Sequence, residues 1–299
     1  MRGSAPLLVS VIMSMRNSAA TVEAAARSVL VQSLPNLEFI VIDDGSHDQS
    51  SLIIESFGDP RIRLVREPQS AGLATRLNQA VALAKGEFIA RMDADDICFP
   101  DRLARQVARL RERPLLDVLG CRAAVFRNDG ALIGELPVGR SHRDVTAHPF
   151  VGFPLPHPTW CGRADWFRSH RYDDRLRYAE DQDLLLRSFR DSTFGGLDAV
   201  LLAYRQDGLS LKKLLPGRAT FVKSVWRNKA RPAEVWSAMA GSANQVAKGM
   251  VDIATIGFGL KRWMQFSRLR PVSPGVAQEW HQLRQTLGVA SAPGNESVG

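Results

Sequence analysis

Residues 86–96, GEFIARMDADD, are the stretch of this sequence that decides its fold. A glycine ends the helical pattern before it, residues 87–92 form an apolar run typical of a buried strand, and three aspartates follow at once. Side chains two positions apart in an extended segment point to the same side, so Asp93 and Asp95 present two carboxylates together, with Asp96 adjacent. Open α/β sheets bind ligands at the carboxyl ends of their strands, so this turn is a candidate ligand site.

A second predicted strand, residues 39–42, ends in the same way, with Asp43, Asp44, Gly45 and Ser46. Further strands and helical patterns alternate around these two strands, at 7–13, 21–32, 61–65, 72–85 and 100–113. Such alternation is typical of βαβ units. It predicts the α/β class, with a mostly parallel sheet flanked by helices.

Acidic residues at the ends of two strands of one sheet favour a polyhydroxylated, phosphate-bearing ligand that is held partly through a metal ion. Mg²⁺ and Mn²⁺ prefer oxygen ligands and often bind one or two carboxylates plus phosphate oxygens. Neither GxGxxG after the first strand nor GxxxxGK[ST] occurs, so a metal, supported by an arginine such as Arg66 or Arg76, is the expected partner of a diphosphate. The alternatives are a helix-capping acidic loop and, at 43–46, a turn closed by its own hydrogen bonds.

The less regular segment 114–209 contains two further candidate site regions. Glu180 and Asp181 open an apolar helical run, where a carboxylate is ordinarily a cap. The run holds more acids than capping needs, so Asp181 is a candidate general base for an attacking hydroxyl. His157 lies in a proline-rich loop, where it either contacts substrate, completes a metal shell or makes a structural hydrogen bond; Glu180 is likewise a candidate contact to acceptor or metal.

The composition is that of a globular protein: 299 residues, 45% of them hydrophobic and 23% charged. Disorder and collagen-like repeats are therefore excluded. The three cysteines are too widely spaced for a disulfide framework or a paired zinc site, and the sequence shows neither a signal peptide nor 18 uninterrupted apolar residues. These features favour a cytoplasmic protein.

The net charge of +8 is concentrated near the C-terminus. Residues 1–209 carry 26 Lys and Arg against 27 Asp and Glu, whereas residues 210–299 carry 13 against 4. We therefore expect a near-neutral catalytic body at 1–209, divided into a nucleotide-binding half at 1–113 and an acceptor half at 114–209. A basic, mainly helical appendage follows at 210–299, with breaks expected at Pro216, Pro232 and 271–274 and with disorder in the last ten residues.

The appendage leaves two structural alternatives open. Residues 211–231 interleave seven cations with apolar side chains such as Phe221 and Trp226 and contain no acid. Such a segment suits the surface of an anionic membrane, but it suits equally a helix that packs on the body and turns its lysines to water. A nucleic-acid-binding protein is disfavoured, because the acidic edge of the sheet would repel phosphates.

Five segments, taken in order, resemble the family 2 glycosyltransferases with the GT-A fold. These segments are VSVIMS at 9–14, DDGS at 43–46, GEFIARMDADD at 86–96, HPT at 157–159 and ED at 180–181. The resemblance covers residues 7–205 and implies inverting transfer of a sugar from a nucleotide diphosphate donor, with Mn²⁺ or Mg²⁺ as cofactor. A metal-dependent nucleotidyltransferase is the alternative within this fold class, but it would normally carry a glycine-rich loop after the first strand.

The resemblance also implies roles for single residues. Asp44 matches the family's base-reading aspartate, and Ser14 and Arg16 fall where the nucleoside is contacted. Asp93 and Asp95 match its DxD motif, in which Asp95 would hold the metal, and Asp181 matches its catalytic base. Arg16 stands where many members have an aromatic residue, and its guanidinium can still stack on a base. We expect a UDP-sugar donor, a glycan or lipid-linked acceptor, no nucleic-acid partner and a cytoplasmic protein, which is peripheral on the cytoplasmic face of the membrane under the alternative in which residues 211–231 contact lipid.

Overall fold

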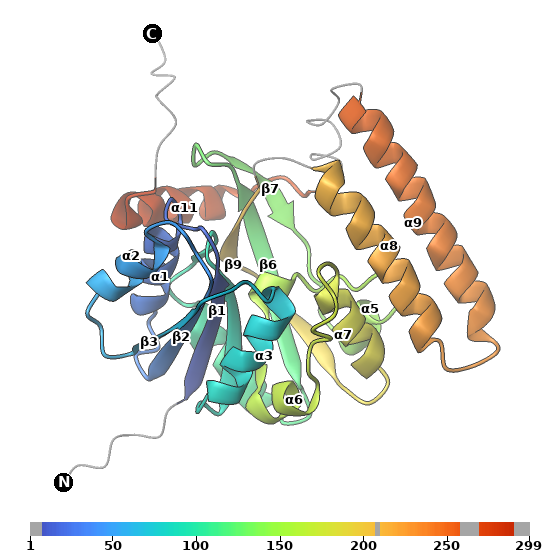
Figure 1. Ribbon diagram of the computed structural model, residues 1–299, viewed down its shortest axis with the longest axis horizontal. Coiled ribbons are helices and arrows are strands. Elements are labelled where there is room, and N and C mark those ends of the chain that lie inside the picture. The colour runs from blue at the N-terminus through green and yellow to red at the C-terminus, as the bar shows by residue number, and fades with distance from the viewer. Residues whose placement is uncertain (1–7, 207–209, 258–268, 290–299) are drawn as a thin grey trace.

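The centre of the protein is a nine-stranded sheet in the order β3-β2-β1-β4-β8-β6-β9-β5, with β7 paired to β6 (Figure 1). The computed structural model describes residues 8–206, 210–257 and 269–289. The strands are β1 (Val9–Met15), β2 (Leu37–Asp44), β3 (Ile62–Glu67), β4 (Phe88–Asp93), β5 (Ile97–Cys98), β6 (Val118–Phe126), β7 (Leu132–Leu136), β8 (Cys161–Arg163) and β9 (Phe194–Arg205). The helices are α1 (Val22–Leu30), α2 (Ser50–Ser56), α3 (Leu73–Leu83), α4 (Arg102–Glu112), α5 (His142–Val145), η1 (His157–Thr159), α6 (Ala164–Ser169), α7 (Glu180–Ser188), α8 (Leu211–Asn228), α9 (Glu234–Gly257) and α11 (Pro274–Leu287).

Parallel pairing of β1 with β2 and β4, and of β2 with β3, builds the N-terminal half of the sheet. β1, β2 and β4 are buried along almost their whole length, which explains their continuous apolar runs, whereas the edge strand β3 is only partly buried. β6 and β9 form another parallel pair, whereas β5, β7 and β8 run antiparallel to their neighbours. Most paired residues lie in the parallel ladders, and helices flank both faces, so the predicted α/β architecture is confirmed.

The register brings the carboxyl ends of the central strands together. Ser14 of β1 lies between Ile42 of β2 and Asp93 of β4. β8 is inserted between β4 and β6, and it draws η1 and its flanking loop against β4, where the backbone N–H of Arg91 donates to the carbonyl of Trp160 at 2.8 Å. The two predicted acidic turns and the proline-rich loop therefore lie at one edge of the sheet.

The segments after β9 pack on two different parts of the body. α8 lies along α7, with Phe221 and Val225 buried in the core. Its Arg227 binds Asp183 of α7 (Nη2 to Oδ1, 2.6 Å) and Asp173 (Nη1 to Oδ2, 3.0 Å). α9 runs beside α8 at the edge of the molecule, whereas α11 lies on the opposite side of the sheet (Figure 1).

α11 closes a separate part of the core. Its residues Trp280, Leu283 and Leu287 are buried, and the Trp280 ring lies 4.6 Å from that of Phe126. The predicted helix break at Pro216 is wrong, because α8 continues through this residue. Pro216 falls in the second turn of the helix, where its missing N–H removes one backbone hydrogen bond. The expectation of disorder at 290–299 falls outside the described residues, and the boundary at 209/210 stays a prediction.

Candidate active site

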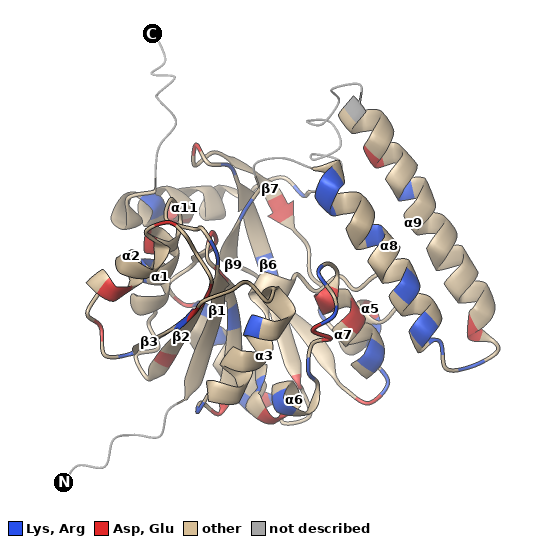
Figure 2. Ribbon diagram, viewed as in Figure 1, with Lys and Arg blue, Asp and Glu red and all other residues tan. Residues whose placement is uncertain are grey.

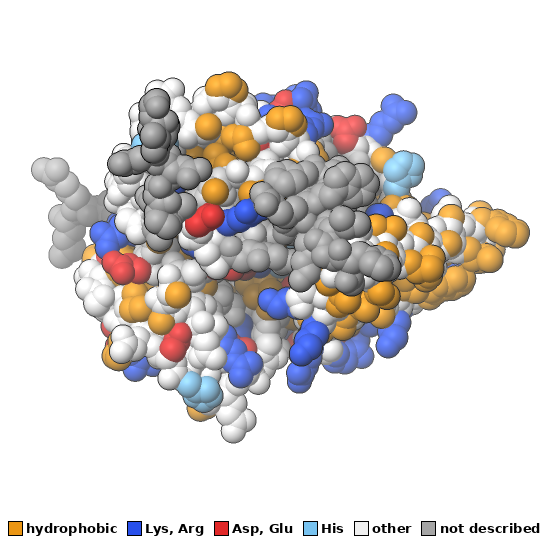
Figure 3. Space-filling model, turned by 90° about the horizontal axis from the view of Figure 1, so that it is seen from above, with side chains coloured by type: hydrophobic (Ala, Val, Ile, Leu, Met, Phe, Trp, Pro, Cys, Tyr) orange, Lys and Arg blue, Asp and Glu red, His pale blue; other side chains and the backbone are white. Residues whose placement is uncertain are grey.

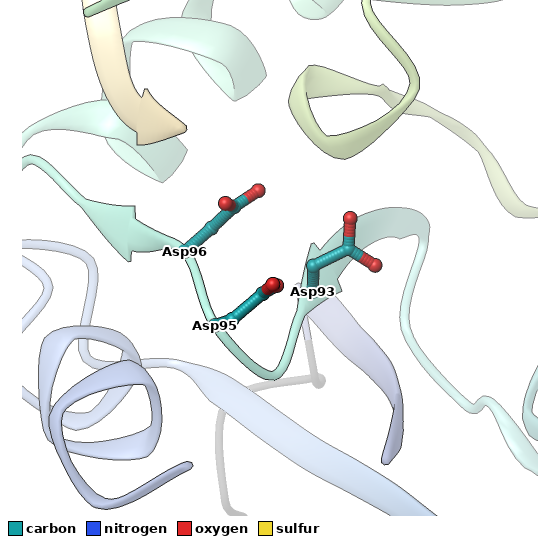
Figure 4. A group of neighbouring side chains, drawn as sticks. All are labelled: Asp93, Asp95 and Asp96. Carbon is teal, nitrogen blue, oxygen red and sulfur yellow. The ribbon is translucent and has the colours of Figure 1, made fainter. Parts of the chain in front are cut away.

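The acidic turn after β4 gathers three carboxylates. One oxygen each of Asp93, Asp95 and Asp96 lies within 4.8 Å of the others, and the three side chains extend into one space (Figure 4). Two contacts fix the turn: Thr21 Oγ1 donates to the carbonyl of Ala94 at 2.9 Å, and the N–H of Arg205 donates to Asp96 Oδ1 at 2.9 Å. The start of α1 and the end of β9 thus hold the turn from two sides.

The electrostatics of this turn fit a divalent cation. Burial and the charge of Asp93 raise the pKa of Asp95, and burial with both neighbouring carboxylates raises the pKa of Asp96 well above its ordinary value. The Oδ2 atom of Asp96 is buried without a hydrogen-bond partner. Clustered carboxylates with an unsatisfied oxygen match the hard oxygen ligands that Mg²⁺ and Mn²⁺ prefer. The residues present therefore fit the metal that the sequence predicted here.

Arg91 is a buried cation beneath the acidic turn. One of its terminal nitrogens, Nη2, is bonded to Asp93, while Nε and Nη1 are buried without a partner in the structure. Burial alone would lower its pKa, but the nearby anionic groups, led by Asp93, raise it. No role for Arg91 was predicted from the sequence. The available signal was a charged side chain in the middle of an otherwise apolar strand.

The predicted nucleoside contacts are linked to one another. Asp44 accepts four hydrogen bonds, from Ser70 Oγ (2.7 Å), the N–H groups of Ala71 (2.7 Å) and Gly72 (3.1 Å), and Arg76 Nε (2.7 Å). Burial raises the pKa of Asp44, but these donors, led by Ser70, outweigh burial and keep the pKa below its usual value. The carboxylate therefore orders the 69–72 loop.

Arg16 joins the same loop, because its Nη1 donates to Ser70 Oγ at 3.0 Å. Arg66 and Arg76, the two arginines expected to support a diphosphate, are both paired with acidic residues. Arg76 is buried between Asp44 and Glu67, and Arg66 is paired with Glu55. Arg16 and Arg66 are both exposed, so either can contact a diphosphate at this edge of the sheet, and that role stays a prediction.

Asp181 lies in the first turn of α7, after Ala179 in a left-handed conformation (φ 54°). Burial raises the pKa of Asp181, and a hydrogen bond from Gln182 Nε2 at 3.2 Å partly opposes that increase. Burial together with the charge of Asp181 raises the pKa of Glu180 to about 7. Two adjacent carboxyl groups thus share a poorly solvated site, an arrangement suited to proton transfer near neutral pH.

His157 has a neutral imidazole. Burial, reinforced by the charge of Arg91, lowers its pKa well below the ordinary value, and its Nε2 lies 2.8 Å from the hydroxyl of Tyr172. Among the described residues, the group of clustered potential metal ligands contains neither His157 nor Glu180. The structural hydrogen bond is therefore present, while a contact to acceptor stays a prediction.

A cavity of about 680 Å³ lies beside Asp181. Its wall is mainly apolar and is formed by residues 153–158 and by side chains of β6 and β7. Tyr204 of β9 and Lys248 of α9 also line it. Tyr204 directly precedes Arg205, whose backbone N–H donates to Asp96, so the end of β9 joins the cavity wall to the acidic turn. Neither Tyr204 nor Lys248 was predicted from the sequence, because only the fold brings β9 and α9 to Asp181.

Comparison with known proteins identifies the family. The model of glycosyl transferase family 2 matches residues 10–157. EpsE of Bacillus subtilis (strain 168), which carries a glycosyltransferase name, is 34% identical over 212 residues, covering 69% of this chain and 75% of EpsE. Among solved structures, TarS of S. aureus in complex with UDP has a TM-score of 0.62 at 18% identity, covering 94% of this chain and 80% of that one.

A mannosyltransferase of Pyrobaculum calidifontis, solved with GDP-Man and Mn²⁺, has a TM-score of 0.59 at 16% identity, covering 95% of this chain and 88% of that one. At such identities these two structures establish the fold alone, and they agree with the GT-A architecture that the sequence motifs predicted. This chain belongs to glycosyl transferase family 2 and is a glycosyltransferase.

Proposed function

We propose that this enzyme transfers a sugar from a nucleoside diphosphate sugar to an acceptor hydroxyl, with inversion at the anomeric carbon, in the assembly of a bacterial-type polysaccharide or glycolipid. The observation that carries the proposal is the position of Asp181 in the wall of a cavity that the end of β9, from Tyr204 to Arg205, joins to the acidic turn. A donor bound at the turn and an acceptor bound in the cavity would meet beside Asp181.

The donor side is assigned to the turn and to the ends of β1 and β2. Asp95 would hold the metal, with Asp93 and the unsatisfied oxygen of Asp96 available beside it. A divalent ion bound there would act as a Lewis acid on the departing diphosphate. Ser14 and Arg16 would contact the nucleoside, and Asp44 would either read the base or keep the 69–72 loop in place against it.

UDP is the donor nucleotide that we propose first. The complex of TarS with UDP supports this choice, whereas the complex of the mannosyltransferase with GDP-Man shows that the same fold also serves a purine nucleotide. Arg16 would stack on the base through its planar guanidinium, which accepts either kind of ring. A nucleotide-sugar screen therefore has to include GDP-sugars beside UDP-sugars.

On the acceptor side, Asp181 would take the proton of the attacking hydroxyl. Its raised pKa makes the carboxylate a stronger base than an exposed aspartate, provided that the group is ionised. A single displacement inverts the anomeric centre and needs no covalent sugar–enzyme intermediate. The apolar wall with Lys248 at one side favours an acceptor that combines an apolar part with an anionic group.

The test is a screen of nucleotide sugars with Mn²⁺ or Mg²⁺, scored by released nucleoside diphosphate and by the anomeric configuration of the product. We expect Asp181→Asn to bind the donor with near-parental affinity and to transfer sugar roughly 10²-fold more slowly or worse, because the substitution removes the base but keeps its size. Asp165→Asn, at an exposed acid of α6, is the matched control. Parental transfer by Asp181→Asn would assign the base to another residue.

A further inference from the structure

α9 presents an apolar face that nothing in the described structure covers. Its most exposed large side chains are Trp236 (76% exposed), Val246 (61%) and Met250 (61%). All exposed residues between 236 and 254 are uncharged: Trp236, Ser237, Met239, Ala240, Ala243, Asn244, Val246, Ala247, Met250, Val251, Ile253 and Ala254. A helix that contacted only water would carry charges on this face. These residues form the outer face of α9.

The charged residues of α9 all lie away from the outer face. Glu234 is paired with Arg190, Asp252 is buried against Arg218, and Lys248 lies in the wall of the cavity beside Asp181. The inner side of the helix is held closely by the body, since Gln245 Nε2 donates to the carbonyl of Val151 at 2.8 Å. The outer face is therefore fixed in orientation.

A row of cations borders the outer face. Lys212, Lys213 and Lys223 of α8 are exposed, and α8 runs beside α9. Figure 2 shows basic residues along α8 and an α9 that is almost free of charge, and Figure 3 shows the apolar side chains of this region with Lys and Arg side chains along their lower margin. No helix of the described chain is long and apolar enough to span a membrane.

We infer that the outer face of α9 lies in the interfacial layer of an anionic membrane, with the lysines of α8 on the lipid headgroups. An apolar helix face with tryptophan and a basic border is the pattern of interfacial helices. A second copy of the chain is the weaker occupant, because pairing two such surfaces would bring like charges together, whereas anionic lipid neutralises them. The anionic lipid is therefore the occupant to which both the apolar and the charged residues are complementary.

This assignment differs from the sequence-based expectation that residues 211–231 themselves contact the membrane. Phe221 and Val225, which were candidates for insertion, are buried in the core. α8 therefore supplies charge, and α9 supplies the apolar contact. Since Lys248 leaves the same helix toward the cavity, a membrane under α9 would bring a lipid-linked acceptor close to Asp181, a consequence that rests on the proposed function.

The experiment is flotation of the full chain with vesicles of phosphatidylcholine alone or with phosphatidylglycerol added. The parent protein should float with the anionic vesicles and hardly at all with the neutral ones. Val246→Glu combined with Met250→Glu should abolish flotation, while Leu52→Glu combined with Leu115→Glu, at exposed apolar sites of the body, should leave it unchanged. Replacing Lys212, Lys213 and Lys223 by Gln should weaken binding to anionic vesicles on the order of 100-fold.

Two results would overturn the inference. One is equal flotation of the parent and the Val246→Glu/Met250→Glu variant, both having the same circular dichroism spectrum. The other is a parent that is dimeric by light scattering, binds no vesicles and becomes monomeric in that variant, which would assign the outer face to a second copy. Flotation involves no sugar transfer, so its failure is distinguishable from failure of the proposed reaction.

Discussion

At the scale of single residues, the acidic turn concentrates negative charge. Asp93, Asp95 and Asp96 repel one another, and the single positive charge of Arg91, which is bonded to Asp93, offsets only part of that repulsion. A divalent ion would relieve both the repulsion and the unsatisfied oxygen of Asp96.

Asp95→Ala is expected to lower metal affinity and to reduce transfer roughly 10²-fold or more, because it removes the proposed metal ligand. Titration with Mn²⁺ followed by electron paramagnetic resonance measures the affinity directly. Asp101→Ala is the control, since Asp101 is exposed before α4 and makes no capping hydrogen bond through its side chain. Full turnover in excess EDTA by a metal-free preparation would contradict the assignment of the turn.

The raised pKa values of Glu180 and Asp181 predict the pH dependence of transfer. A base works only when ionised, and burial raises the pKa of Asp181, so kcat should already fall at a pH above the range of an exposed aspartate. The charges of Glu180 and Asp181 oppose each other's ionisation, so Glu180→Gln should move the midpoint to lower pH. The measurement is kcat against pH at saturating donor and metal; an unshifted midpoint in that variant would show that the pair does not control the reaction.

At the scale of elements, α9 approaches the loop before η1 through a glycine. A Cβ atom at Gly241 would lie 2.1 Å from the carbonyl oxygen of Phe150, whereas one at Gly249 would make only an ordinary contact of 3.6 Å with Leu215. Two glycines of one helix therefore differ sharply in what they permit. The first allows close packing of α9 on the body, and the second is replaceable.

Gly241→Ala should destabilise the protein by about 1–3 kcal/mol and raise the KM for the acceptor, because α9 has to move away and takes Lys248 with it. Gly249→Ala should leave both quantities close to the parental values. Thermal unfolding and acceptor kinetics measure the two effects. If both variants behave alike, the packing of α9 does not shape the cavity.

Much of the element order was predictable because its signals are local. Continuous apolar runs ending in acids located β2 and β4, and the spacing of Asp93 and Asp95 placed two carboxylates on one side. By contrast, Tyr204 and Lys248 carry no local pattern, since tertiary packing alone brings them to Asp181. The sequence also left the role of 211–231 open, because an amphipathic helix does not reveal which of its faces the body covers.

At the scale of the whole molecule, helices of the basic C-terminal region pack into the hydrophobic core of the body. α8 contributes Phe221 and Val225 to the core on one face of the sheet, while α11 contributes Trp280, Leu283 and Leu287 elsewhere. Each large apolar side chain that is buried contributes about 1.5–3 kcal/mol. Residues 1–209 and 210–299 differ in charge composition, but their apolar side chains share the same hydrophobic cores.

A chain ended at residue 209 should therefore unfold at a temperature lower by roughly 10 °C, because the partners of these side chains become exposed. It should also bind the dye ANS, which reports exposed apolar surface. A chain ended at residue 289 keeps α8, α9 and α11 and is the control. An unchanged unfolding temperature on truncation at 209 would show that the body is stable by itself.

Three neighbouring residues of α7 each make a different contact, and one of these is the contact of Asp183 with Arg227. Asp181 lies at the cavity, Gln182 is tied to the N–H of Phe153 in the cavity loop at 2.9 Å, and Asp183 is clamped by α8. The three residues follow one another in the first turn of α7, so they cannot move independently. A displacement of α8 that moves Asp183 would therefore also shift the carboxylate of Asp181, two residues away.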